Sequence, residues 1–217
     1  MRFKLFISNL LVSHLFQEFS GNFDQNTIVS HSLTVPIIAR YIRFRPLAWN
    51  NQIGMRVELY GCQDCGKPLG MENFAISDGS ISASSRYSSY HDPKNSRLNY
   101  EEGTGGWRAG INANSWLQID LGHLFTKVTG VATQGRHSTI FPHHVTKYKL
   151  QYSEDGVSFQ YYREEGQHNN KEFDGNADQD TVVYHGLHSP ITARFIRFLP
   201  TAWSNSVALR VELYGCI

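Results

Sequence analysis

Three cysteines are the residues of this chain whose type and spacing point most directly to chemistry. Cys62 and Cys65 are separated by two residues, a spacing that can ligate a metal ion or form a redox pair, although no second such pair follows. A disulfide between Cys65 and Cys216 is the alternative. It would close a loop of about 150 residues, stabilise the fold by about 4–5 kcal/mol and leave Cys62 unpaired. A disulfide-bonded domain indicates an oxidising compartment, so we expect the chain to be extracellular, either secreted or part of an ectodomain.

Histidines are the second group with potential chemistry. His137, His143 and His144 fall within one short segment, but no Cys or carboxylate accompanies them there, so we expect no metal site. The sequence lacks the nucleophile elbow G-x-S-x-G, the zinc motif H-E-x-x-H and the phosphate loop G-x-x-x-x-G-K-[ST], so we predict neither catalysis nor a cofactor. The formal net charge of +1 predicts no general attraction to nucleic acid, and no apolar run reaches the length of about 18 residues typical of a transmembrane segment.

The elements that position these residues are organised by a repeat. Residues 18–62 return without a gap as residues 172–216, and 28 of the 45 aligned pairs are identical. The offset of 154 residues (172 − 18) matches one ordinary domain, whereas solenoid and propeller repeats use about 20–50 residues. We therefore interpret residues 65–216 as a complete domain and residues 18–62 as the C-terminal part of a truncated one, whose missing strands would leave unpaired edges.

The segment before the repeat has a different character. Residues 1–17 show no resemblance to residues 155–171, their partners in the ungapped register. Arg2 and Lys4 precede an apolar run in the manner of a signal peptide, but polar residues interrupt the run and no clear cleavage site follows. We expect this segment to be either weakly signal-like or an artefact of the gene model.

The complete domain has the pattern of short strands separated by polar loops. Period-two alternation and β-rich composition predict seven strands, at residues 115–122, 127–133, 146–153, 157–162, 181–184, 193–199 and 208–214. Pro200 is expected to end the strand before it, because proline has no N–H for a ladder hydrogen bond. Three loops are too long for simple hairpins and are expected to carry the binding residues. They cover residues 84–95, 101–108 and 135–144.

A set of ordered motifs resembles the discoidin domain, the family also called the coagulation factor V and VIII type C domain. The motifs are Cys65, ISDGSISASS at 76–85, SWLQIDLG at 115–122, VATQGRH at 131–137, ARFIRFLP at 193–200 and RVELYGC at 210–216. The resemblance implies an all-β fold, an eight-stranded antiparallel jelly-roll sandwich or barrel, with an incomplete discoidin fragment before it. It also implies a Cys65–Cys216 bridge, a ligand face built from the three loops, and adhesion or ligand binding rather than catalysis.

Membrane-binding members of the family insert apolar loop tips into lipid while nearby basic residues meet anionic headgroups, and the resemblance carries this arrangement onto matching positions. The tips here are Tyr87, Tyr90, Ile140 and Phe141, and the nearby basic or protonatable residues are Arg86, His91, Lys94, Arg136, His137, His143 and His144. The opposing charges of Asp92, Glu101 and Glu102 lead us to expect only weak lipid binding.

Several of these side chains also have structural interpretations. The rings of Tyr87 and Tyr90 could cap the barrel and leave only their hydroxyls outside. Phe141 could be a loop anchor packed on Trp107. Arg136 could be an internal clamp that donates to loop carbonyls.

The sequence leaves the class of ligand open. In collagen-binding members the TQGRH motif contributes to the ligand groove, which keeps a functional role for Arg136 and His137. The expected partner is a cell-surface or extracellular-matrix protein, with an anionic phospholipid as another candidate. A carbohydrate-binding module is the alternative function, because Tyr90, His91, Asp92 and Arg136 are the residue types that hold sugars in related jelly rolls.

Overall fold

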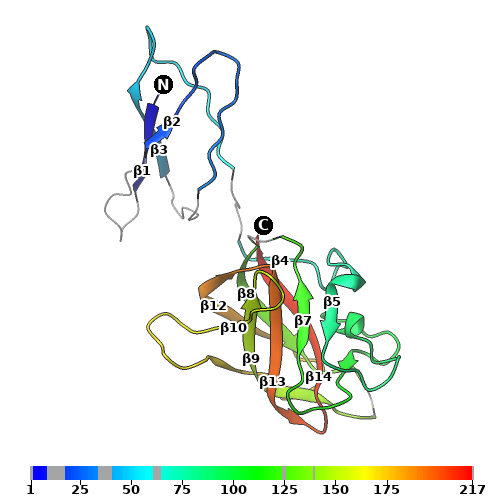
Figure 1. Cartoon of the computed structure of the whole chain (residues 1–217). Coiled ribbons are helices and arrows are strands. Elements are labelled where there is room, and N and C mark those ends of the chain that lie inside the picture. Colours follow the sequence, from blue (N-terminus) through cyan, green and yellow to red (C-terminus); the bar gives the residue numbers. More distant parts are fainter. Residues whose placement is uncertain are drawn as a thin grey trace. The chain divides into compact units, whose positions relative to one another are not determined.

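The computed structural model describes residues 2–8, 18–33, 41–60, 65–123, 126–138 and 140–216. The chain divides into two compact units, Met1–Tyr60 and Gly61–Ile217 (Figure 1). Cys62 lies outside the described residues, so its unpaired state stays a prediction. Within the described ranges, no helix is both long and apolar enough to cross a membrane.

The larger unit consists of two antiparallel sheets packed face to face (Figure 1). One sheet has the strand order β10-β9-β13-β7-β5, with β11 also paired to β9, and the other has the order β12-β8-β14-β4, with β6 also paired to β14. The strands are β4 Lys67–Pro68, β5 Ile81–Ala83, β6 Trp107–Arg108, β7 Leu117–Asp120, β8 Lys127–Gln134, β9 His144–Ser153, β10 Gln160–Tyr161, β11 Glu172–Asp174, β12 Val183–Thr192, β13 Phe195–Ser204 and β14 Ala208–Cys216. Two single-turn 3₁₀ helices, η1 Asp78–Ser80 and η2 Pro93–Asn95, complete the described part of this unit.

The predicted all-β class is confirmed. The described residues of this unit form eleven strands rather than eight, since segments of two or three residues such as β4, β6 and β10 also pair. Alternation explains the longer strands: Leu117 and Ile119 of β7 are fully buried, and Gln118 between them is half-exposed. Strand β14 differs because residues 208–213 are all buried, so it lies in the centre of the molecule.

Two strands run further than the sequence predicted. Strand β13 continues through Pro200 to Ser204, so the expectation that Pro200 ends a strand is wrong. The pairing register shifts between Pro200 and Ala202, and such a bulge accommodates a residue that cannot donate to the ladder. Strand β12 extends to Thr192, with a register shift between Gly186 and Ile191.

The disulfide joins the two ends of the larger unit. Cys65 and Cys216 are bonded, with their Cα atoms 4.8 Å apart and 151 positions between them in the sequence. This confirms the predicted bridge and excludes Cys65 from a metal or redox pair with Cys62. Because the bridge closes so long a loop, it restricts the unfolded chain strongly.

The smaller unit corrects the interpretation of residues 1–17. Its sheet has the order β2-β1-β3, where β1 is Arg2–Ser8, β2 is Glu18–Ser20 and β3 is Tyr41–Ala48. Phe3 of β1 pairs with Phe19 and Pro46. In the larger unit Tyr148 of β9 pairs with Phe173 (19 + 154) and Pro200 (46 + 154). Strand β1 therefore occupies the place of β9 in the first copy.

The sequence supports this equivalence once a gap is allowed. RFKLFIS at 2–8 aligns with KYKLQYS at 147–153 and shares its lysine, leucine and serine. The ungapped comparison missed the match because the step from Ser8 to Glu18 is nine residues shorter than the step from Ser153 to Glu172 (19 − 10). Residues 2–8 therefore belong to the repeat, and a strand accounts for their apolar pattern.

Candidate ligand-binding face

Direct hydrogen bonds bring the three predicted loops together at one end of the larger unit. The Tyr87 N–H donates to the carbonyl of Arg108 at 2.9 Å, which joins the first loop to the second. The His137 N–H donates to the carbonyl of Gly105 at 2.8 Å, which joins the third loop to the second. Gly105 has φ +69°, and a Cβ there would lie 2.1 Å from the carbonyl oxygen of His137, so only glycine allows this approach. The predicted convergence of the loops is confirmed.

A buried arginine that sequence reasoning missed holds this end of the molecule in place. Arg210 lies on β14 with only 1% of its surface exposed. Its guanidinium donates to the carbonyls of Gly135 at 2.7 Å, Tyr100 at 3.0 Å and Gln179 at 2.9 Å, and to a carboxylate oxygen of Asp180 at 2.9 Å. One side chain thus fixes three backbone segments. The sequence placed Arg210 only in a strand motif, because its acceptors are distant along the chain.

Arg136 has the contacts of an internal clamp. The side chain is buried, and one terminal nitrogen donates to the carbonyl of Thr104 at 3.0 Å. Its Nε is also buried but has no hydrogen-bond partner. Burial and the nearby cation Arg108 both lower the pKa of Arg136. A buried cation with an unpartnered N–H favours an anionic group beside it.

Four cationic or protonatable groups gather where the loops meet: His91, Arg108, Arg136 and His143. The guanidinium of Arg108 stacks over the ring of Tyr87 at 3.8 Å from its centroid. Burial, together with the smaller effects of Arg108 and Arg136, lowers the pKa of His143 to about 4. Burial, Arg136 and Arg108 likewise lower the pKa of His91. The positive charge at pH 7 therefore lies on the two arginines, and we call Arg108 and Arg136 the cation cluster.

The histidines behave differently from the sequence expectation. Both His143 and His144 are buried, and burial lowers the pKa of each, so they are neutral at pH 7 and supply no positive charge to the surface. His137 is half-exposed, and its Nδ1 lies 2.9 Å from a carboxylate oxygen of Asp180. His143 and His144 therefore add no positive charge beside the loop tips at pH 7. In the described part of the chain, no three His, Cys, Asp or Glu side chains are arranged to hold a metal ion.

The predicted loop tips are exposed. Tyr87 is 57% exposed, Tyr90 75%, Ile140 74% and Phe141 57%. Tyr90 therefore does not cap the barrel, whereas the ring of Tyr87 is partly covered by Arg108. A further exposed tip, Ile111, was missed by the sequence reasoning; its N–H donates to the hydroxyl of Ser85 in the first loop.

Trp107 supports the loops from inside instead of contacting solvent. Its side chain is fully buried, and its indole N–H donates to the carbonyl of Ser85 at 2.9 Å. Phe141 stacks on His143 with 6.0 Å between ring centroids, so the expected anchor of Phe141 on Trp107 is replaced by this stack. The roles of the predicted site residues in binding stay predictions, although all of them lie at this loop end.

The opposing charges at the loop end are partly compensated. Asp92 forms an ion pair with Arg86 and also accepts the N–H of Lys94, which caps η2. His91 Nδ1 lies 2.9 Å from the hydroxyl of Ser88. Because Asp92 and His91 have partners and Arg136 is buried, these residues do not present a free polar set for a sugar.

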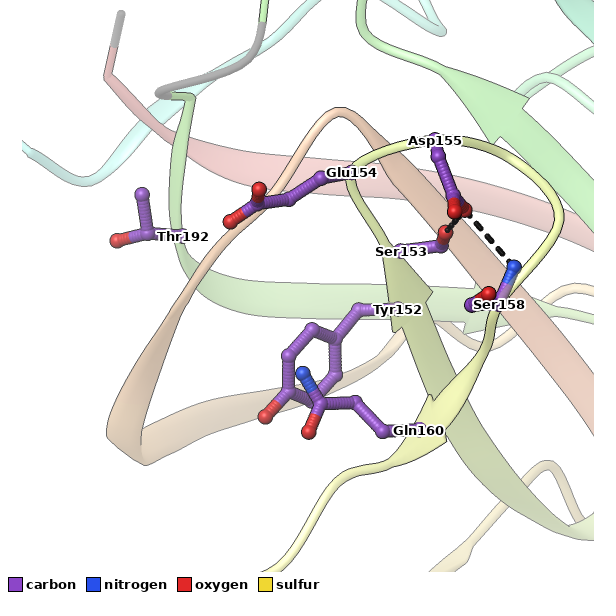
Figure 2. A pocket seen from close by; sticks show the side chains of 7 residues that line it. All are labelled: Tyr152, Ser153, Glu154, Asp155, Ser158, Gln160 and Thr192. Carbon is purple, nitrogen blue, oxygen red and sulfur yellow. Dashed lines mark hydrogen bonds between the residues drawn. The ribbon is translucent and has the colours of Figure 1, made fainter.

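A hollow lies at the other end of β9 from the third loop (Figure 2). It has a volume of about 280 Å³ and is lined by Tyr152, Ser153, Glu154, Asp155, Ser158, Gln160 and Thr192. The carboxylate of Asp155 accepts hydrogen bonds from the backbone N–H groups of Ser158 and Val157 and from the Ser153 hydroxyl, and these bonds hold its pKa well below the usual range. The carboxylate therefore stabilises a turn.

Comparison with known proteins agrees with this architecture. The sequence model of the F5/8 type C domain matches residues 7–59 and 80–213. The chain belongs to this family. The discoidin resemblance is thus confirmed.

Its relatives are larger proteins. The chain is 41% identical over 204 residues to the venom prothrombin activator pseutarin-C non-catalytic subunit of Pseudonaja textilis, covering 91% of this chain and 14% of that protein. It is 40% identical over 205 residues to mouse coagulation factor V, covering 91% of this chain and 9% of that protein. It is 40% identical over 207 residues to mouse EGF-like repeat and discoidin I-like domain-containing protein 3, covering 91% and 43%. The chain therefore spans less than half the length of these relatives.

Solved structures give the same fold. Recombinant discoidin II of Dictyostelium discoideum matches with a TM-score of 0.56 and 27% identity, over 63% of this chain and 55% of that one. The family, the relatives and the formed disulfide agree on an extracellular binding module.

Proposed function

We propose that this discoidin domain is a non-catalytic adhesion module whose loop end binds membranes that carry anionic phospholipid headgroups. The observation that carries the proposal is the combination of exposed apolar tips with the cation cluster. Tyr90 and Ile140 are each about three quarters exposed, and Arg136 is a buried cation with an unpartnered Nε. A membrane interface can accommodate both features, because its acyl-chain region buries the apolar tips and its anionic headgroups attract the cations.

The magnitudes favour weak, reversible binding. Full burial of a large apolar side chain contributes about 1.5–3 kcal/mol, and each tip is more than half exposed, so partial insertion contributes about 1 kcal/mol per tip. Each Lys or Arg near an anionic surface adds about 1 kcal/mol. Arg108 is available for this role, whereas Arg86 forms an ion pair with Asp92 and Lys94 forms one with Asp78. Glu101 and Glu102 are exposed and oppose the attraction.

Vesicle binding tests the proposal directly. The test variant carries Ile140→Ser and Phe141→Ser, and the matched control carries Val157→Ser and Val182→Ser, two exposed valines outside the three loops. Co-sedimentation is measured with vesicles of phosphatidylcholine alone and with phosphatidylserine added. We expect binding only to the anionic vesicles and a loss of about 30-fold or more in the test variant, which corresponds to about 2 kcal/mol.

The control variant should bind as the unchanged chain does. Equal binding to both kinds of vesicle would show that the cation cluster does not contribute to membrane binding. Full binding by the Ile140→Ser, Phe141→Ser variant would show that these loop tips do not contribute to it. If no vesicle binds but attachment to cells or matrix depends on the same tips, the partner of this face is a protein or a glycan and the membrane proposal fails.

A further inference from the structure

The hollow at the other end of β9 from the third loop collects polar side chains from both sheets of the larger unit. Tyr152 and Gln160 lie opposite each other in the ladder between β9 and β10, so their side chains share one face. Thr192 ends β12 of the other sheet, and Glu154 follows β9 directly. Figure 2 shows Glu154 extending toward Thr192, with Tyr152 and Gln160 on the facing side.

These four side chains keep their capacity for hydrogen bonding. Within the described part of the chain, the carboxylate of Glu154 and the amide of Gln160 form no hydrogen bond or ion pair, and the hydroxyls of Tyr152 and Thr192 form none either. Each group has an oxygen that can accept a hydrogen bond. Tyr152 is half-buried and packs against the hydrophobic core, which holds its ring in place. Convergent polar groups around a fixed aromatic ring are typical of a binding site.

The charge of the hollow is negative. Glu154 and Asp155 both line it, and none of the lining residues is Lys, Arg or His. Hydrogen bonds from backbone N–H groups and from the Ser153 hydroxyl hold the pKa of Asp155 well below its usual range, so this carboxylate is ionised at pH 7. Lys127, the ladder partner of Thr192 on β8, is not among the lining residues. The hollow therefore favours a cationic ligand over a neutral or anionic one.

The backbone on both sides of Glu154 is fixed before any ligand binds. Strand β9 ends at Ser153, whose hydroxyl accepts the N–H of Gly156 at 3.0 Å. The carboxylate of Asp155 accepts the N–H groups of Val157 and Ser158, each at 2.8 Å. Because the turn is already ordered, a ligand of Glu154 has little backbone entropy to overcome.

We propose that this hollow binds a primary alkylammonium group, either the end of a lysine side chain of a partner protein or a small amine. The carboxylate of Glu154 and the amide oxygen of Gln160 accept two of the three N–H donors of an ammonium. A hydroxyl of Tyr152 or Thr192 accepts the third. The alkyl stem packs along the ring of Tyr152. The volume of about 280 Å³ lies just below the range of about 300–1,000 Å³ for drug-sized ligands, which suits so small a group.

Other cations fit the hollow less well. Calcium takes about six to eight oxygen ligands, whereas the Asp155 carboxylate is committed to its turn. A guanidinium is a planar fork of five donors, and a compact ammonium is the better match for one free carboxylate flanked by neutral oxygens. The hollow is separate from the loop face, so this inference does not depend on membrane binding.

Titration with a lysine analogue tests the proposal. The probe is Nα-acetyl-lysine methylamide, and its Nε-acetylated form is the neutral control. Amide chemical shifts are followed in proton–nitrogen NMR spectra of the parent chain, of Glu154→Gln and of the matched control Glu165→Gln, an exposed glutamate that does not line the hollow. We expect saturable shifts confined to residues 152–160 and 192, with a Kd in the millimolar range because one exposed charge pair contributes little.

The Glu154→Gln variant should bind the probe about tenfold more weakly or not at all, and Glu165→Gln should bind it as the parent does. The neutral control should cause no saturable shift. A parent chain that shows no saturable shift overturns the proposal, as does equal binding of the neutral control or full binding by Glu154→Gln. Titration with n-butylamine distinguishes the two sources: weaker binding than the lysine probe assigns the hollow to a protein side chain, and equal or tighter binding assigns it to a free amine.

Discussion

Replacing Arg210 with methionine should destabilise the larger unit more than any change at its exposed surface. Methionine has a similar length but no donor, so the carbonyls of Gly135, Tyr100 and Gln179 would each lose a hydrogen bond in a buried setting. Each unsatisfied buried group costs about 1–3 kcal/mol, and relaxation reduces the sum. We expect a loss of about 3–5 kcal/mol in the free energy of unfolding, or a fall of about 10 °C in Tm for a domain of this size.

The chain contains its own matched control for this change. Arg56 occupies the same position of the repeat but is exposed, so Arg56→Met should change the free energy of unfolding by no more than about 0.5 kcal/mol. Thermal unfolding followed by near-ultraviolet circular dichroism gives the two Tm values. Amide hydrogen exchange should also become faster in residues 135–138 of the Arg210→Met variant. A fall in Tm of less than about 2 °C, with unchanged exchange in this loop, would refute the assignment of Arg210 as the clamp of the loop end.

Two further predictions concern the disulfide and His143. The double variant Cys65→Ala, Cys216→Ala should lose about 3–5 kcal/mol of unfolding free energy in a denaturant titration, because the 151-residue separation is no longer closed in the unfolded chain; an unchanged midpoint would contradict this. Because the pKa of His143 is lowered from 6.5 to about 4 in the fold, the unfolded chain takes up the proton first on acidification. The stability that this histidine contributes is complete above about pH 6.5 and declines toward pH 4. The His143→Gln variant should therefore show a flatter pH dependence of Tm over this window. An unaltered slope would show that His143 does not cause the pH dependence.

The local features of the sequence were sufficient for the class of fold and for the positions of the three loops. Period-two alternation predicted β7 and β9, and the polar length of three segments predicted that they would be loops, whereas the exposed tips such as Ile140 came from the family resemblance. These features depend on neighbouring residues, because strand faces alternate along the chain and long polar loops lie on the surface. The repeat located both domains in the same way, by direct comparison of residues.

Gaps and bulges limited the prediction of strand boundaries. The strand at Arg2–Ser8 escaped the ungapped comparison because a shorter loop separates it from the repeat. Pro200 continues its strand because a bulge, formed against β9, accommodates the missing N–H. Whether a proline ends a strand or sits in a bulge depends on the partner strand, and the partner is distant in sequence.

The sequence by itself determined the family and the two cysteines of the disulfide, since both rest on residue identity and order. The tertiary structure alone decided the pKa of His143, the clamp formed by Arg210 and the exposure of residues 53–60. A histidine pKa depends on burial and on cations brought from other loops, and an arginine becomes a clamp only when acceptors from distant segments meet it. The two copies make the point directly, because Val57 and Val211 share one local sequence pattern and differ only in the strands that cover them.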